Sequence, residues 1–300
     1  MPSISELLNN DQLPSGDNIE NSDGVPMYDS SQNKTVGVPA DRFIQNTSGG
    51  GGGTSYTESA SDYVGSTSDG GSAIQAAINN LPSGGGNVVV PAVGPDTNSV
   101  WEVNSTIQLP SNCSIILLSA TIYAGNGLDD NIFENDDQTN GNENIEILGN
   151  GYNAVIDGNV SGQSRTVSES NSPQWNMVEL YQVDGISFGN LKVQNLYGWA
   201  TNFEDVTDVY VYPILYDGDD VVKNQDGMHI IGPAKNIVIE RLWGSTGDDM
   251  LSWESHANSQ ASLGSGGDIT NVQVGTVVNE IHNAIRVQPG GNQVIENMHV

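Results

Sequence analysis

A short strand pattern recurs along the second half of the chain and limits what this chain can fold into. The segments DGMHI, DMLSW and NAIRV begin at Asp226, Asp249 and Asn283, and each alternates polar and apolar residues. The first two begin 23 positions apart, which is within the range of one solenoid coil. The polar stretch 254–267 accounts for the longer gap before the third. The repeat therefore predicts a solenoid in which these segments stack.

A second kind of strand lies between these segments, in KNIVIERL, DITNVQVGTVV and NQVIENMHV. Each coil thus has one strand of each kind joined by a turn, whereas a propeller blade needs four strands in a longer repeat. The chain has 36 glycines, and with many Asn, Asp and Ser residues they favour short strands and turns over long helices. We predict an all-β fold, a right-handed parallel β-helix.

The chain divides into three regions that differ in amino-acid composition. Residues 1–46 hold too few apolar residues for a core of their own and are expected to be an attachment or oligomerisation segment. Residues 47–58 include SGGGGGT and are predicted to be a flexible linker. Residues 59–300 form the predicted β-helix, and an amphipathic helix at Ser72–Asn80, with its first residue as N-cap, caps the start. Because the last residues stop in mid-coil, we expect the coils to continue or to be capped beyond 300.

Acidic residues outnumber basic ones by 37 to 8, which gives a net charge of −29. Phosphate binding needs clustered Lys and Arg, so we expect no nucleic-acid partner. No apolar run is long enough to span a membrane, and no signal peptide opens the chain, so we expect no membrane insertion. The acidity fits either cation sites or adaptation to high salt, and the scarcity of lysine favours high salt. The single cysteine, Cys113, is expected to be buried.

Alternation assigns faces within strands of the first kind. Trp253 is predicted to point inward, into the core. His229, Ser252 and Arg286 are predicted to point outward and to form one column along the surface.

A second column is predicted at the entrances of the same strands, where Asp226, Asp249 and Asn283 lie. Neighbouring parallel strands are about 4.8 Å apart, so Asp226 and Asp249 should be close in space. Asp248 lies on the adjoining turn. The sequence therefore predicts an aspartate cluster on one outer face.

An aspartate cluster of this kind has three possible roles: catalysis, cation binding and turn capping. Mutual repulsion raises one pKa and leaves a proton donor beside an ionised base, as in an inverting glycosidase, whose two carboxyl groups lie about 6.5–9.5 Å apart. The same oxygens could hold Ca²⁺. Aspartates at strand ends also cap backbone N–H groups in turns, which would be a purely structural role.

Two motifs resemble the polygalacturonase-type glycoside hydrolases of family 28. NQDGMHI, from Asn224, resembles the N-x-D-G motif, and GSTGDDM, from Gly244, resembles the G-D-D motif. More broadly the chain resembles the pectate lyase superfamily, also through DGG, the helix and GGGNVVVP between Asp69 and Pro91. The resemblance covers roughly residues 60–300 and implies a β-helix that binds or cuts polysaccharides.

The resemblance also implies catalytic roles. Asp248, the first aspartate of G-D-D, would be the general acid, and Asp226 and Asp249 would flank the attacking water. We expect no cofactor and no resident metal, with Ca²⁺ at the cluster as the alternative, because His229, His256 and His282 lack a recognisable metal-ligand spacing.

Substrate-binding candidates lie in the two outer columns: His229, Ser252, His282, Asn283 and Arg286. Asn283 stands in the column where the family has the histidine of its G-H-G motif, and His282 is one residue away. The family's R-x-K clamp has no match, although Arg286 is in an outward column.

The first 46 residues resemble the leading segment of tail proteins from tailed viruses. An I-S-E-L stretch starts at Ile4, a P-x-Y-D-S-S piece at Pro26 and a K-T-x-x-V piece at Lys34. This resemblance implies a homotrimeric tailspike in the virion tail, and the acidity of the chain would then point to a high-salt environment. It would bind other tail or baseplate proteins through residues 1–46 and present the β-helix to host surface polysaccharide or glycoprotein glycans.

The leading hypothesis is therefore a tailspike or tail fibre that recognises host glycans and could depolymerise them, by hydrolysis or as a lyase. The alternatives are a secreted polygalacturonase-like hydrolase and a non-catalytic structural or adhesive β-helix.

Overall fold

The computed structural model describes residues 56–300 apart from 66–68, 96–99, 165–175, 220–223 and 257–261. All the described residues belong to one compact unit, Pro39–Val300. The predicted attachment segment and most of the predicted linker lie outside the described residues. The first described strand begins at Thr57, inside the range predicted as linker.

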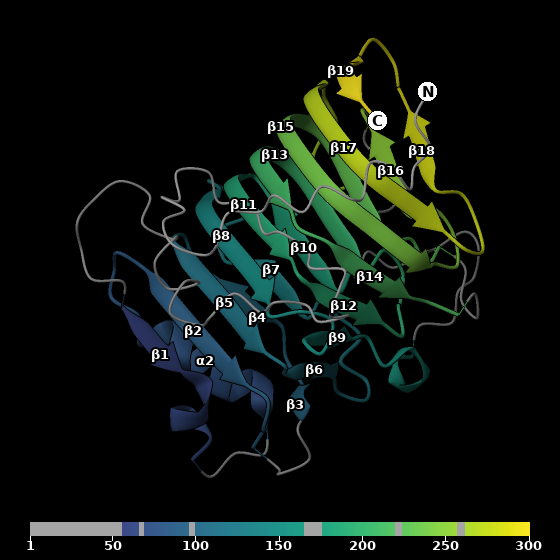
Figure 1. Ribbon diagram of the computed structural model, residues 1–300. Helices are drawn as coiled ribbons and strands as arrows, with labels where there is room; N and C mark the ends of the chain where they lie inside the picture. Colours follow the sequence, from purple (N-terminus) through teal and green to yellow (C-terminus); the bar gives the residue numbers. More distant parts are fainter. Residues whose placement is uncertain (1–55, 66–68, 96–99, 165–175, 220–223, 257–261) are drawn as a thin grey trace, which may run out of the picture. The chain divides into compact units, whose positions relative to one another are not determined.

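Short parallel strands stack coil on coil into a parallel β-helix (Figure 1). Each strand pairs with its equivalent in the next coil. Met228 pairs with Leu251, 23 positions later, and Leu251 pairs with Ile285. The solenoid predicted from the repeat is confirmed, with the polar insertion between the last two of these strands.

The strands form three lines around each coil. The first line holds the strands of the first kind: β4 (Ile107–Leu109), β7 (Phe133–Asn135), β10 (Val178–Tyr181), the start of β13 (Thr201–Val211), the start of β15 (Met228–Ser245), β16 (Leu251–Glu254) and β18 (Ile285–Gln288). The second line holds β1 (Thr57–Ser59), β2 (Gly86–Pro91), β5 (Cys113–Leu118), β8 (Asn142–Gly149), β11 (Val183–Gly189), the rest of β13, the middle of β15, β17 (Ile269–Asn279) and β19 (Ile295–His299). The third line holds β3 (Val100–Val103), β6 (Thr121–Ala124), β9 (Val155–Asp157), β12 (Leu191–Gln194), β14 (Ile214–Asp217) and the ends of β15 and β17.

The helix α2 (Gly70–Asn79) packs at the first coil, and two short 3₁₀ helices are η1 (Ala60–Tyr63) and η2 (Val160–Gly162). The predicted N-cap of α2, Ser72, is wrong by three residues, because Asp69 is the N-cap and accepts a 3.0 Å hydrogen bond from the Gly71 amide. Glycine disfavours helix, but a Cβ at Gly70 would lie 2.7 Å from the Trp101 Cα. Close packing, and not helix propensity, therefore sets this end.

A left-handed backbone residue recurs at one position of the second line in successive coils. The residues are Asn112, Asn144, Gly185, Asp208, Asn236, Asn271 and Asn297. Asparagine and aspartate adopt this conformation more readily than other side-chain-bearing residues. The Asn271 amide donates to Asn236 Oδ1 at 3.1 Å, and the Asn236 amide donates to Asp208 Oδ1 at 2.7 Å. We call this column the asparagine ladder.

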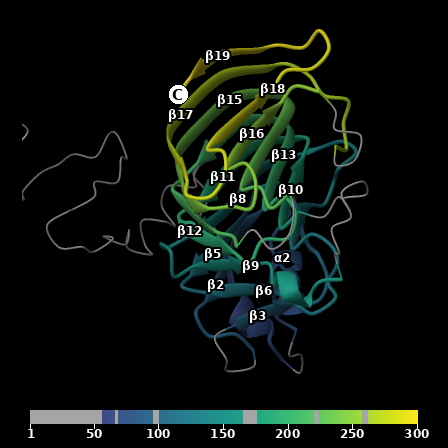
Figure 2. The ribbon, with the colours of Figure 1, turned by 90° about the vertical axis from the view of Figure 1, so that its right-hand side faces the viewer.

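The core lies between the three lines of strands and runs the length of the stack. Trp253 and Cys113 are fully buried, as predicted. Figure 2 shows the coils from a second side, with α2 and β3 near one end and β17, β18 and β19 at the other. Among the described helices, none has the length and apolar character needed to cross a membrane.

Candidate active site

The parallel register brings the three predicted aspartates together. The Gly227 amide donates to the Asp249 carbonyl at 2.9 Å, so the entrances of β15 and β16 lie side by side. One carboxylate oxygen from each of Asp226, Asp248 and Asp249 lies within 4.8 Å of the other two. A Cβ at residue 227 would approach the Met250 carbonyl to 2.5 Å, so the Gly after Asp226 permits this close packing.

Asp226 is 2% exposed and has two unlike oxygens. Its Oδ2 lies 2.7 Å from His229 Nε2, in a hydrogen bond between buried groups. Its Oδ1 is buried and has no hydrogen-bond partner among the described residues. Oδ1 is therefore the oxygen of Asp226 that can accept a new proton.

Asp249 is 1% exposed, and both of its oxygens already accept hydrogen bonds. The Asn283 amide donates to Oδ1 at 2.9 Å, and Arg286 Nη1 donates to Oδ2 at 3.3 Å. Donors from the neighbouring coil thus occupy both oxygens of Asp249 inside the cluster.

Asp248 is half-buried and is the least covered of the three. Burial raises the pKa of its carboxyl group, and the charges of Asp226 and Asp249 raise it further, while His282 and Arg286 act in the opposite direction. Its backbone carbonyl accepts 2.8 Å bonds from Thr246 Oγ1 and from the Asn279 amide, which fix the turn. The cluster thus contains one carboxyl group with a raised pKa beside two buried partners.

The predicted outward column exists but is not open to solvent along its length. His229 pairs with Ser252, and Ser252 pairs with Arg286. However, His229 is 1% exposed and Ser252 is fully buried, while the Arg286 side chain is 42% exposed. The prediction of a surface column is therefore wrong for His229 and Ser252. The other three substrate-binding candidates, His282, Asn283 and Arg286, are exposed.

Two non-repeating segments lie over this face. The Trp199 ring stacks on the His229 ring with centroids 3.6 Å apart and an interplanar angle of 11°. Farther along, the Leu263 and Gly264 amides donate to the buried carboxylate of Glu204 at 2.8 and 2.7 Å. Both segments lie outside the repeat, so strand alternation gives no sign of them.

A polar pair three residues apart recurs at these strand entrances. The Asn131 amide donates to Glu134 at 2.8 Å, and the Asn176 amide donates to Glu179. Asp226 and His229 form the equivalent pair two coils later. The spacing N-x-x-E, followed by D-x-x-H, is the sequence signal of this pair, and it marks Glu134 and Glu179, which strand alternation and the family motifs do not single out.

The aspartate cluster has the oxygen chemistry that Ca²⁺ prefers. Oxygen ligands at about 2.3–2.6 Å from one ion lie up to about 5 Å apart, so oxygens within 4.8 Å of one another are compatible with a cation. Two observations oppose it: both oxygens of Asp249 are already bonded, and one bond comes from the positive Arg286. The arrangement therefore favours proton transfer over metal binding.

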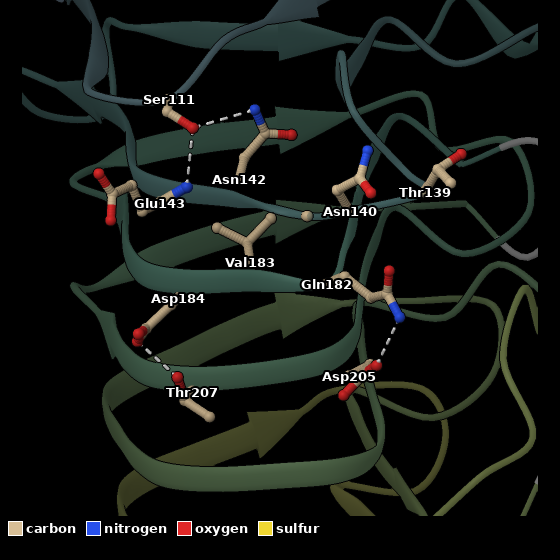
Figure 3. A pocket seen from close by; sticks show the side chains of 11 residues that line it. Ser111, Thr139, Asn140, Asn142, Glu143, Gln182, Val183, Asp184, Asp205 and Thr207 are labelled. Carbon is tan, nitrogen blue, oxygen red and sulfur yellow. Dashed lines mark hydrogen bonds between the residues drawn. The ribbon is translucent and has the colours of Figure 1, made fainter. Parts of the chain in front are cut away.

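A separate polar pocket of about 590 Å³ lies over β8, β11 and β13 (Figure 3). Asp184 accepts a 2.5 Å bond from Thr207, and Asp205 accepts a 3.0 Å bond from Gln182. No residue of the aspartate cluster lines this pocket. Among its lining residues no three carboxylates meet as they do in the aspartate cluster.

Solved polygalacturonases share this fold. The family 28 exopolygalacturonase of Yersinia enterocolitica aligns with a TM-score of 0.57 and 16% identity, over 80% of this chain and 57% of its own. A polygalacturonase of Erwinia carotovora gives 0.52 and 18%, over 77% and 66%. A hyperthermoactive exopolygalacturonase of Thermotoga maritima gives 0.54 and 17%, over 81% and 66%. The chain therefore has a parallel β-helix fold like theirs and spans between 57% and 66% of their lengths.

No protein-family model matches the sequence, and no curated protein matches it either.

Proposed function

We propose that this protein recognises glycans on the outer face of its β-helix and hydrolyses a glycosidic bond at the aspartate cluster. The observation that carries this proposal is the group of three carboxylates with oxygens within 4.8 Å of one another but in unlike surroundings. A glycoside hydrolase needs one carboxyl group that keeps its proton and another that accepts one. Asp248 and Asp226 have those two environments.

Asp248 donates its proton to the glycosidic oxygen as the bond to the anomeric carbon breaks. A water attacks that carbon, and its proton passes to Oδ1 of Asp226, the oxygen without a partner. The charge of Asp249 raises the pKa of Asp248 and so helps to keep the proton there.

Inverting glycosidases have their two carboxyl groups about 6.5–9.5 Å apart, and retaining ones about 5–5.5 Å apart. Proton NMR of the first anomer released gives the stereochemical course directly.

The test of hydrolysis is the release of reducing ends from host envelope polysaccharide in high salt. Asp248→Asn should lower kcat by about 10²- to 10⁴-fold, the usual contribution of a general acid. Asp62→Asn, at an exposed position on η1, is the matched control and should leave kcat unchanged.

Three results would contradict this mechanism. Glycan binding without any product would leave the adhesive alternative. A product that absorbs in the ultraviolet would indicate a lyase. Full activity in Asp248→Asn would remove Asp248 as the acid.

We further propose that the protein is a homotrimeric tail protein of a virus, with host surface glycans as ligands and other tail or baseplate proteins bound through residues 1–46. The support is the sequence of that segment and its resemblance to tail proteins. A secreted hydrolase of the same fold is the alternative.

The oligomeric state tests the attachment segment. We expect light scattering to give three times the chain mass for residues 1–300, and a lower mass after deletion of residues 1–46. A monomer at full length would contradict the trimer.

A further inference from the structure

His229 lies between two buried carboxylates from neighbouring coils. Its Nε2 is 2.7 Å from Asp226 Oδ2, and its Nδ1 is 3.8 Å from Glu254 Oε1. The side chains of all three residues are no more than 2% exposed. A buried carboxylate is costly unless a positive or hydrogen-bonding group offsets it, and His229 faces both.

The residues that flank the imidazole along its column and cover its face are neutral. Ser252 of β16 and Asn202 of β13 flank His229 in the same column, and Trp199 covers the ring. Glu254 Oε2 and His229 Nδ1 are buried without hydrogen-bond partners among the described residues. Glu254 Oε1 is nevertheless 3.8 Å from Nδ1, so the carboxylate faces this edge of the ring.

We propose that His229 is a positioning residue for the hydrolysis, and that Glu254 acts through His229. The inference rests on the proposed function. The Nε2–H group holds Oδ2 of Asp226, which leaves Oδ1 facing the attacking water. Glu254 faces Nδ1 and so favours the ring orientation in which Nε2 meets Asp226, and the stacked Trp199 ring holds the plane of the imidazole. Neither His229 nor Glu254 contacts the glycan.

The first test needs no substrate. In ¹H–¹⁵N NMR of the histidine side chains of the full chain, which has four histidines, His229→Gln identifies the His229 signal. We expect Nε2 of His229 to carry a proton, and Glu254→Gln to change the ring-nitrogen signals of His229 while the other three stay the same. Glu134→Gln, on the same face three coils away from His229, is the control.

Two NMR results would overturn the proposal: an unprotonated Nε2, or His229 signals that do not respond to Glu254→Gln. Thermal unfolding of each variant identifies any loss of fold.

The second test is kinetic, with the glycan that the wild-type protein cleaves. His229→Gln should lower kcat by up to about 100-fold, the cost of a misplaced catalytic group, with little change in KM. Glu254→Gln should lower kcat in the wild-type background but not in the His229→Gln background, because residues that act in series are not additive.

Equal losses of kcat from Glu254→Gln in both backgrounds would contradict the proposal that Glu254 acts through His229. If the wild-type protein cleaves no glycan, the proposed hydrolysis fails, and the NMR result still decides whether Glu254 and His229 are coupled.

Discussion

Glu179 shows how a single side chain on this face acquires unusual chemistry. Strand alternation turns it outward, in the same column as Asn202 and His229, yet it is 3% exposed. Burial raises the pKa of its carboxyl group to about 8, with smaller increases from the charges of Glu204 and Glu134, and hydrogen bonds from Asn176 and Asn202 oppose the rise.

This raised pKa predicts a pH dependence of stability. The folded chain keeps the Glu179 proton up to a pH of about 8, whereas the unfolded chain loses it near 4.5. Stability from this group is therefore fully present below 4.5 and is lost as the pH rises towards 8, by at most about 1.4 kcal/mol per pH unit.

Glu179→Gln should remove that part of the pH dependence. Urea unfolding between pH 4.5 and 8 measures it, and parallel curves for the variant and the wild type would contradict the assignment. Glu134→Gln, the preceding residue of the column, serves as the comparison.

Some features of the aspartate cluster can be predicted from the sequence, and others are visible only in the structure. Motif and register were enough to bring Asp226, Asp248 and Asp249 to one place, because parallel coils turn a fixed offset into a neighbour contact. The unlike oxygens of Asp226 and Asp249 were not predictable, because they depend on which side chains reach them: His229 for one and Asn283 with Arg286 for the other.

The asparagine ladder is a feature of the strands, since its left-handed residues recur at the same position in successive coils. Its left-handed residues would cost other side-chain-bearing residues about 1–2 kcal/mol each. Asn236 accepts a bond from Asn271 and donates one to Asp208, so it supports two neighbouring coils.

Asn236→Ala should lower the free energy of unfolding by about 2–3 kcal/mol, through backbone strain and lost hydrogen bonds. Asn236→Gly keeps the backbone conformation and should lose only about 1 kcal/mol from the bonds. Asn153→Ala, at an exposed residue with an ordinary backbone, is the control. Equal losses for Ala and Gly would show that strain at φ +58° has no part.

Element boundaries follow from contacts as well as from pattern. The sequence separates Met228–Ile231 from Asn236–Ile239, whereas β15 runs continuously from Met228 to Ser245 with pairing to β13 and β17 on both sides. Neighbouring coils hold the bend at Asn236 within the sheet, which alternation within one segment cannot indicate.

At the scale of the whole molecule, the net charge of −29 opposes any compact state. We expect the Tm to rise by several degrees between about 0.1 M and about 1 M NaCl, as the Debye length falls from about 10 Å to about 3 Å. The same scan near the pI of 4.1, where the net charge vanishes, is the control and should show a much smaller effect. A Tm that does not change with salt at neutral pH would contradict charge repulsion as the cause.

The sequence by itself determined the β-helix, the two columns and the meeting of Asp226 with Asp249, because a regular repeat encodes which residues alternate and which coils touch. Only the tertiary structure decided that His229 and Ser252 are buried, that Trp199 covers the imidazole and that Oδ1 of Asp226 lacks a partner. Exposure depends on segments outside the repeat, such as the one that brings Leu263 to Glu204, and no periodicity specifies where such a segment packs.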